Sequence, residues 1–469
     1  MHLTNTARLL VTAAALAGLS QAAFADGVDD YLKAQMTARH IPGLSVVVVQ
    51  NGKVVKAQGY GLANVEQSSP ATADTIYPIG SLSKQFTAVA VMLLVQEGKV
   101  KLDAPLSQYL AAMPKTWQPI TVRELLNQTS GIPEWEPNLD KDSLLHEFPL
   151  AEIANKAALK PLLFTPGTQF AYSNTNYNLL AGIIEKASGK PYSDFLRARL
   201  FMPLNMASTG VYDPQEIVLG RSAGCDRFKG KVYNNTFLYD PSYYLGAGNL
   251  ESTVSDMGKW DAALVAGKVL PAPALTQIWT PPTLPGGNHT SYGMGWDREI
   301  IKGHLLLWHN GSITGCMGFV GRFPGDHLSI VILSNMMPLD GFDDTPPFFG
   351  LGLGLAKHYL PDFAKHDDGI PDTDPQTAAL LKTVSAQLAS GTLDKSLFAP
   401  SFQVLLTPAA VDPAHALLAP LGPLTSLALL RRDAGGPARY RALYGTTAVD
   451  WLIAVDKDHK ITGLRPQPE

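Results

Sequence analysis

The 469-residue sequence is poor in the features that several common functions require. It has two cysteines, its formal net charge is −4, and its basic residues do not form a run. Nucleic-acid binding needs a basic stripe that displaces counterions from phosphates, so we expect no nucleic-acid partner. The 11 histidines show no paired metal-ligand spacing and no cysteine cluster exists, so we expect no metal site.

Two other signatures are missing. The Gly-x-Ser-x-Gly elbow, which marks the nucleophile of α/β-hydrolases, does not occur. The glycine-rich run at 350–354 does not follow a predicted strand and lacks the dinucleotide-binding spacing. The sequence therefore predicts no cofactor.

Residues 1–25 have the features of a signal peptide. Basic side chains precede an apolar stretch from Leu9 to Leu19, which is too short to span a bilayer. Ala23 and Ala25 form an A-x-A pattern that predicts cleavage after Ala25, and an uncleaved anchor helix is the alternative. No later segment is long and apolar enough for a membrane span. We expect a periplasmic or secreted protein with no integral membrane span after cleavage.

The two cysteines, Cys225 and Cys316, could pair in an oxidising compartment. Sequence alone does not show whether they meet, and two unpaired, buried thiols are the favoured interpretation. Neither cysteine lies in a glycine-flanked turn before a helix, so a cysteine nucleophile is not indicated.

The hydrophobic pattern predicts strands at both ends of a large domain. Runs at 43–50 and 53–60 flank Asn51-Gly52, a strong type I′ hairpin signal, and a second hairpin is predicted from 315–323 and 328–334. Helical segments are predicted between them, at 81–97, 122–127, 176–187 and 254–265. We therefore expect an α/β (α+β) fold with an antiparallel sheet built from both termini of the domain, flanked by helices, plus an all-helical subregion.

A change of pattern follows this domain. We assign residues 26–360 to the large domain and 361–373, rich in Asp and Pro, to a linker. Residues 374–469, where helical periodicity gives way to four predicted strands, form a small α+β accessory domain.

The strongest chemical signal is Gly80-Ser81-Leu82-Ser83-Lys84, which opens an apolar helix. A serine in the first turn faces unpaired N–H groups and the positive end of the helix dipole, and Lys84 shares its helical face. Burial would lower the lysine pKa and make it a usable base. Considered alone, the pattern could equally be a capping serine with a solvated lysine.

Two further motifs supply possible partners. In Tyr172-Ser173-Asn174, after a Pro-Gly turn, the phenol could relay protons and the amide could hold Lys84 or the substrate, although a turn tyrosine with a capping asparagine is the simpler alternative. A rival Tyr-x-Asn begins at Tyr233. His309-Asn310-Gly311-Ser312 could line a substrate, although a strand ending in an Asn-Gly turn explains it by itself.

Together these motifs resemble the serine β-lactamase and penicillin-binding protein superfamily. The similar branch holds class C β-lactamases, D-Ala-D-Ala carboxypeptidases, D-aminopeptidases and related esterases, that is, peptidase S12-like enzymes. The resemblance runs from about Ile41 to Ser334 and includes segments 77–84, 120–133, 172–174, 292–296 and 309–311. The spacing from Ser81 suits Tyr172, whereas Tyr233 lies too late.

The resemblance implies roles for individual residues. Ser81 would form an acyl-enzyme, with Lys84 and Tyr172 acting together as general base and then returning the proton to the leaving group. The backbone N–H groups of Ser81 and Ser312 would form an oxyanion hole. The expected substrate-binding residues are Asn174, His309, Asn310, Gly311, Ser312 and Trp135, the last as a pocket wall.

One departure bears on the substrate. Efficient β-lactamases of this branch usually carry Lys-Thr-Gly where this chain has His309-Asn310-Gly311, a form similar to the peptidase and esterase members. A neutral histidine attracts a substrate carboxylate less than a lysine does. We therefore expect an exported serine hydrolase acting on a small molecule, a peptide (D-residue carboxypeptidase or aminopeptidase type) or an ester. The alternatives are a β-lactamase of weak to moderate activity and a catalytically silent protein that binds peptidoglycan fragments or a partner.

Overall fold

The computed structural model divides into two compact units, Met1–Asp362 and Phe363–Glu469. The division falls within the segment predicted as a linker, 361–373, most of which, like the predicted signal peptide, lies outside the described residues. The structure describes residues 27–111, 113–135, 146–235, 240–285, 290–313, 315–339, 348–360, 363, 369, 371–403, 405–432, 437–445 and 447–468.

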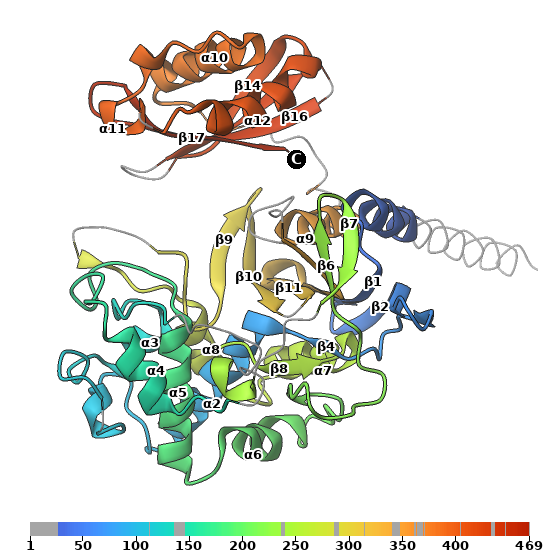
Figure 1. Ribbon diagram of the computed structural model, residues 1–469, viewed down its shortest axis with the longest axis vertical. Coiled ribbons are helices and arrows are strands. Elements are labelled where there is room, and N and C mark those ends of the chain that lie inside the picture. Colours follow the sequence, from blue (N-terminus) through green and yellow to red (C-terminus); the bar gives the residue numbers. More distant parts are fainter. Residues whose placement is uncertain are drawn as a thin grey trace, which may run out of the picture. The chain divides into compact units, whose positions relative to one another are not determined.

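A seven-stranded antiparallel sheet forms the centre of the first unit (Figure 1). Its order confirms that the two ends of the domain pair: β1 (Gly43–Gln50) runs beside β12 (Leu328–Ser334), from Leu44 opposite Ser334 to Gln50 opposite Leu328. The order is β3 (Ser69–Pro70), β2 (Lys53–Asn64), β1, β12, β11 (Cys316–Phe323), β10 (His304–Ile313) and β9 (Asp297–Ile301).

The hairpin predicted at Asn51-Gly52 is present. Both residues have positive φ, 52° and 72°, as a type I′ turn requires, and Gln50 pairs with Lys53 across it. β1 is a Val-rich run that is buried along nearly its whole length, which fits a central strand covered on both faces.

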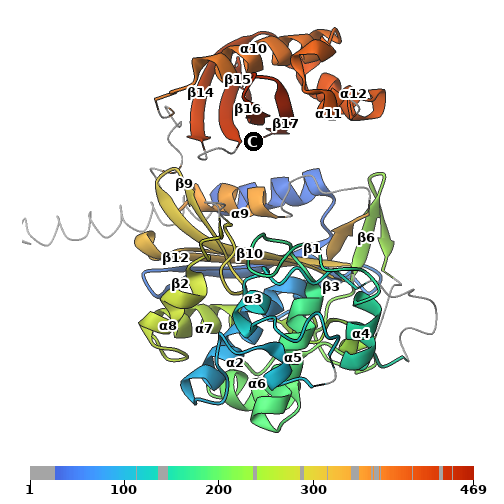
Figure 2. The ribbon, with the colours of Figure 1, turned by 90° about the vertical axis from the view of Figure 1, so that its left-hand side faces the viewer.

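Helices cover both faces of this sheet, as Figure 2 shows edge-on. A helix at 27–39 and α9 (Phe349–Ala356) lie on one face, and α7 (Val254–Val265), α8 (Ala272–Trp279) and α2 (Ser83–Gln96) lie on the other. The glycine-rich run belongs to α9, where a Cβ on Gly352 would lie 2.2 Å from the Phe319 ring. Its glycines therefore permit close packing on the sheet.

The helical subregion is inserted between β3 and β9. Its helices are α3 (Val122–Leu126), α4 (Leu150–Ala157), α5 (Asn174–Ser188) and α6 (Tyr192–Leu196), the last continued by a π-helical turn at Arg197–Phe201. α2 is buried on all sides except near its C-terminal end, as a sequence apolar on nearly all sides predicts. Two short sheets complete the unit: β4 (Tyr77–Pro78), β8 (Leu250–Ser252) and β5 (Gly210–Val211); and β13 (Met336–Pro338), β6 (Cys225–Phe228) and β7 (Lys231–Asn234).

The second unit is a four-stranded antiparallel meander with helices on one face. Its strands are β14 (Leu424–Arg432), β15 (Ala438–Tyr444), β16 (Thr447–Val455) and β17 (Ile461–Pro468), and its helices are α10 (Pro375–Ser390), α11 (Pro400–Gln403) and α12 (Pro408–Leu418). Tyr440, Trp451 and Leu381 meet in its own apolar core. The prediction of a small separate α+β domain is confirmed.

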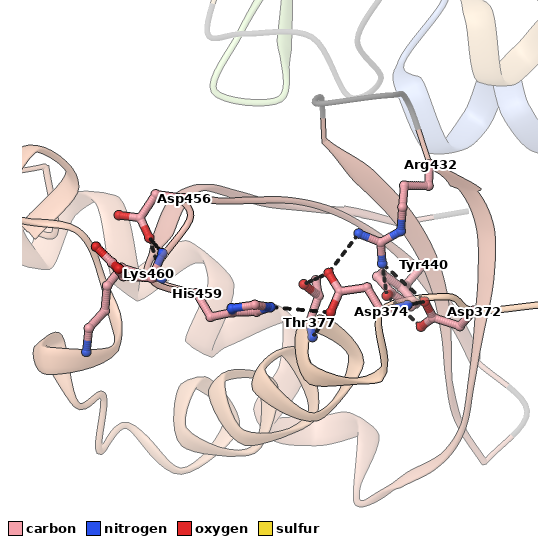
Figure 3. A network of polar contacts seen from close by, with 9 residues as sticks. Asp372, Asp374, Thr377, Arg432, Tyr440, Asp456, His459 and Lys460 are labelled. Atoms are coloured by element: carbon pink, nitrogen blue, oxygen red, sulfur yellow. Dashed lines mark hydrogen bonds and ion pairs between the residues drawn. The ribbon is translucent and has the colours of Figure 1, made fainter.

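Polar contacts fix the start of this second unit to its sheet (Figure 3). Arg432 bridges Asp372 and Asp374 at 3.2 and 3.1 Å, and the Tyr440 hydroxyl donates to Asp372 at 2.7 Å. His459 lies 3.5 Å from Asp374. Each residue has a structural partner here, so we assign this network a stabilising role.

Cys225 and Cys316 are both buried and unpaired, in line with the favoured interpretation. Burial raises the pKa of Cys316 to about 12, which keeps it a thiol. Among the residues that the structure describes, no helix is long and apolar enough to cross a membrane.

Candidate active site

The predicted nucleophile lies at the sharp turn that leads into α2. Ser81 belongs to a 3₁₀ turn, Gly80–Leu82, and not to the α-helix itself, which begins at Ser83. Gly80 has a positive φ of 53°, and the Ser83 hydroxyl donates to the Gly80 carbonyl at 2.7 Å. This tight turn holds Ser81 just ahead of the helix, where unpaired N–H groups gather.

Lys84 is fully buried and its amine lies within hydrogen-bond distance of three oxygens. The distances are 3.0 Å to Ser81 Oγ, 2.7 Å to Asn174 Oδ1 and 2.6 Å to the carbonyl oxygen of Ala247. Two of these oxygens can only accept hydrogen bonds, whereas the serine hydroxyl can also donate. A neutral amine can therefore donate to Asn174 and Ala247 and offer its lone pair to the Ser81 proton.

Burial makes that neutral form accessible near pH 7. Burial lowers the pKa of Lys84 to about 7, and the nearby carboxylate of Glu134 acts in the opposite direction. The ring faces of Tyr172 and Tyr177 lie 4.7 and 5.4 Å from Nζ and, like the Glu134 carboxylate, favour the protonated amine in opposition to burial. A lysine in this environment exchanges protons in the range where a general base must work.

Tyr172 meets the same serine from the turn before α5. Its hydroxyl lies 2.9 Å from Ser81 Oγ and donates to it. The residue is 40% exposed, but desolvation of its hydroxyl raises the pKa of Tyr172 above its usual value, the hydrogen bond to Ser81 lowers it, and the carboxylates of Glu134 and Asp297 raise it further. The phenol is thus a proton donor at neutral pH. The rival Tyr233 lies on β7 and is half-exposed.

Strand β10 lies along the other side of Ser81. A Cβ on Gly311 would be 2.0 Å from the Ile79 carbonyl, and one on Gly80 would be 2.6 Å from the Ser312 nitrogen, so both positions require glycine. The backbone of Ser312 thereby lies directly against Gly80, the residue before Ser81. β9 pairs with β10 only as far as Trp308, so in the described sheet the edge at 309–313 is bonded to β11 alone.

His309 is buried and neutral. Its Nδ1 lies 2.6 Å from the Asn310 carbonyl oxygen, an acceptor, so Nδ1 carries the proton and Nε2 accepts from the Tyr292 hydroxyl at 3.0 Å. Burial and the charge of Lys84 lower the pKa of His309 to about 3. This ring presents no positive charge to a substrate carboxylate.

The structure also identifies residues that the sequence did not. Glu134 holds Asn174 through two hydrogen bonds, and the Ala247 carbonyl completes the contacts of Lys84. Glu134 follows a family motif directly, but no spacing connects it to Asn174. The Ala247 contact could not be predicted, because a backbone carbonyl cannot be recognised from the type of residue that carries it.

One predicted site residue needs correction. Trp135 is 1% exposed, and its ring packs edge-on against Phe148 and Tyr243, with centroids 5.3 and 5.1 Å away. It is a core residue beneath the site and does not wall an open pocket. A large aromatic side chain is stabilised by burial, which explains why Trp135 packs in the core.

Comparison with known proteins identifies the family and the fold. The beta-lactamase family model matches residues 28–349. A penicillin-binding protein of Bacillus subtilis strain 168 is 27% identical over 315 residues, covering 62% of this chain and 67% of that protein. For the next two curated relatives, the match spans 60% and 61% of their own length.

Solved structures show the same fold. The D-amino acid amidase of Ochrobactrum anthropi SV3 in complex with D-phenylalanine is 27% identical, with a TM-score of 0.62, over 72% of this chain and 98% of that one. The octameric penicillin-binding protein homologue of Pyrococcus abyssi is similar in fold over 95% of this chain and 98% of that one, at 21% identity and a TM-score of 0.59. The matched family model spans more than half of the sequence, and the chain therefore belongs to the beta-lactamase family of serine hydrolases.

Proposed function

We propose that the protein is an exported hydrolase that forms an acyl-enzyme at Ser81 and cleaves amide or ester bonds, with peptides or amides of D-residues as its favoured substrates. The supporting observation is the position of Ser81 Oγ, 3.0 Å from Lys84 Nζ and 2.9 Å from the Tyr172 hydroxyl. A hydroxyl held between an amine and a phenol can lose its proton to the first while it accepts a hydrogen bond from the second.

Acylation begins when neutral Lys84 takes the hydroxyl proton of Ser81 as Oγ bonds to the substrate carbonyl carbon. The carbonyl oxygen becomes an oxyanion, which the backbone N–H groups of Ser81 and Ser312 stabilise. The bond from carbon to the leaving nitrogen or oxygen then breaks. The proton held by Lys84 returns to that leaving atom, with the Tyr172 hydroxyl as its relay.

Deacylation repeats these steps with water in place of the serine. Lys84 takes a proton from the water while its oxygen bonds to the acyl carbon. Ser81 Oγ then leaves and regains a proton, and the acid product departs. Substrate backbone lies along the edge of β10 at His309–Ser312, where hydrogen bonds in the manner of a β-strand orient the scissile bond.

The charges at the site support substrates that lack a carboxylate beside the scissile bond. His309 is neutral, and all of the donor capacity of Lys84 is directed at protein oxygens. Glu134 and Asp297 act on Tyr172 as negative charges. The similarity to a D-amino acid amidase points the same way, since an amide carries no charge at that position.

This argument predicts a preference between two substrates that share one scissile bond. An N-acyl-D-Ala-D-Ala amide should be cleaved with a kcat/KM about tenfold higher than the corresponding free acid, because the carboxylate of the acid is repelled by Glu134 and Asp297 and finds no positive charge on His309. Initial rates for both peptides at pH 8, at low and high salt, measure the ratio. A higher kcat/KM for the free acid would contradict this prediction and favour a carboxypeptidase.

Trapping of the acyl-enzyme tests the proposal as a whole. A fluorophosphonate should add covalently to the peptide that contains Ser81, as located by mass spectrometry. A panel of a p-nitrophenyl ester, a D-amino acid amide and nitrocefin should show turnover of the first two, with slower hydrolysis of nitrocefin. An adduct elsewhere, or ligand binding without turnover of any substrate, would overturn the proposal in favour of a silent binding protein.

A further inference from the structure

We propose that Glu134 is a positioning residue, whose carboxylate fixes the side-chain amide of Asn174 so that the amide oxygen faces Lys84. This inference rests on the proposed function, since it concerns how the base is held beside Ser81. It starts from the contacts of Glu134, a partly buried residue just before the core residue Trp135.

Both oxygens of Glu134 accept hydrogen bonds from one residue. Oε2 accepts from the backbone N–H of Asn174 at 2.5 Å, and Oε1 accepts from Asn174 Nδ2 at 3.0 Å. A carboxylic acid would turn one oxygen into a donor that faces an N–H group, so this geometry requires the ionised carboxylate. Hydrogen bonds to an ionised acceptor are also the stronger kind.

The second contact decides which way the Asn174 amide points. The two ends of an amide have almost the same shape, and the amide could rotate to aim its NH₂ group at Lys84. With Nδ2 bonded to Glu134, Oδ1 must face Lys84 Nζ, which it meets at 2.7 Å. Glu134, Asn174 and Lys84 thus form a continuous chain that ends at Ser81 Oγ.

The segment that carries Glu134 is itself fixed to the start of α5. The Thr175 hydroxyl donates to the Pro133 carbonyl at 3.1 Å and accepts from the Trp135 N–H at 3.1 Å. Ser173, at the N-cap of α5, makes no capping hydrogen bond through its side chain. Glu134 supplies that cap instead, at the positive end of the helix dipole, where a carboxylate is favoured.

Glu134 is also the charged group that opposes the effect of burial on Lys84. The other titratable groups that face the amine are Tyr172, Tyr177 and His309, and all three are neutral near pH 7, because their pKa values are raised for the phenols and lowered for the imidazole. The Glu134 carboxylate raises the pKa of Lys84. Removal of this charge should therefore lower the lysine pKa further.

The test compares Glu134→Gln and Glu134→Asp with Glu185→Gln in the full chain, on a p-nitrophenyl ester. Glu185 is a matched control, because its carboxylate also caps a backbone N–H, that of Tyr192 at 2.9 Å, from the far end of α5. We expect Glu134→Gln to lower kcat about 10²-fold with KM within about threefold, the scale of loss when a catalytic group is misplaced by about 1 Å. In Glu134→Gln, the acidic limb of the pH profile, where kcat/KM falls as Lys84 becomes protonated, should move to lower pH. Glu134→Asp should restore part of kcat and the original limb, and Glu185→Gln should match the wild type.

The outcomes separate this inference from the function on which it rests. Wild-type kcat in Glu134→Gln overturns it, and so does a loss of kcat without a shift of the acidic limb, which would mark a merely structural residue. If the wild-type chain shows no turnover that depends on Ser81, the proposed function itself fails. Turnover that depends on Ser81 but is indifferent to Glu134→Gln removes the inference alone.

Discussion

Ser81→Ala is expected to lower kcat/KM on an activated ester by about 10⁴-fold or more, the scale seen when a covalent nucleophile is removed. Alanine deletes the oxygen that lies 3.0 Å from Lys84 and 2.9 Å from Tyr172, and no other described hydroxyl lies between those two groups. The residual rate would come from substrate binding and from the oxyanion-binding N–H groups, which the substitution leaves in place. Ester hydrolysis under single-turnover conditions, followed together with fluorophosphonate labelling, measures both losses.

A matched serine shows whether the loss is specific. Ser188 lies at the C-terminal end of α5, where its hydroxyl accepts from the Lys190 N–H at 3.2 Å, and Ser188→Ala should keep wild-type activity and labelling. Melting temperatures of both variants should remain within a few degrees of the wild type, because neither substitution opens a large cavity. Persistent labelling of Ser81→Ala would mean that another residue is the nucleophile.

Much of the fold could be predicted because local chemistry and long-range packing agree. β1 is a continuous Val-rich run and Asn51-Gly52 can adopt positive φ, so strand and turn were both visible in the sequence. α7 begins and ends where its pattern predicts, at Val254 and Val265, since Thr253 caps it. By contrast, α5 begins at Asn174, earlier than the predicted 176, because Glu134, from a distant segment, bonds its first N–H group.

The arrangement of the site was only partly predictable. Motif order is consistent with bringing Ser81, Lys84 and Tyr172 together, but the state of His309 depends on its surroundings. The sequence allows a protonated imidazole that attracts carboxylates, whereas burial, the charge of Lys84 and the Tyr292 hydroxyl select the neutral ring. Trp135 shows the same limit: its position directly after a motif suggested a pocket wall, whereas its side chain is buried in the core.

We expect the second large loss of activity in the variants Lys84→Met and Lys84→Arg. If the amine is the general base, both variants should lose about 10³-fold in kcat/KM, within the range for removal of such a group. Arginine keeps a positive charge but does not release its proton at working pH, so it separates proton transfer from charge stabilisation. Ester hydrolysis by purified variants with unchanged circular dichroism measures the loss. Near-normal activity of Lys84→Arg would show that the charge alone suffices and that the base lies elsewhere.

The pH dependence of kcat/KM in the wild type tests independently whether the Lys84 amine is the general base. Because burial lowers the pKa of Lys84 to about 7, the active, neutral amine is lost as pH falls through about 7, and kcat/KM should then decrease about tenfold per pH unit. Above that value the rate should reach a plateau, since the raised pKa of Tyr172 keeps the phenol protonated. A lysine of ordinary pKa would instead give a rate that still climbs at pH 9. A single acidic limb near pH 7, absent from both Lys84 variants, therefore assigns the base to this amine.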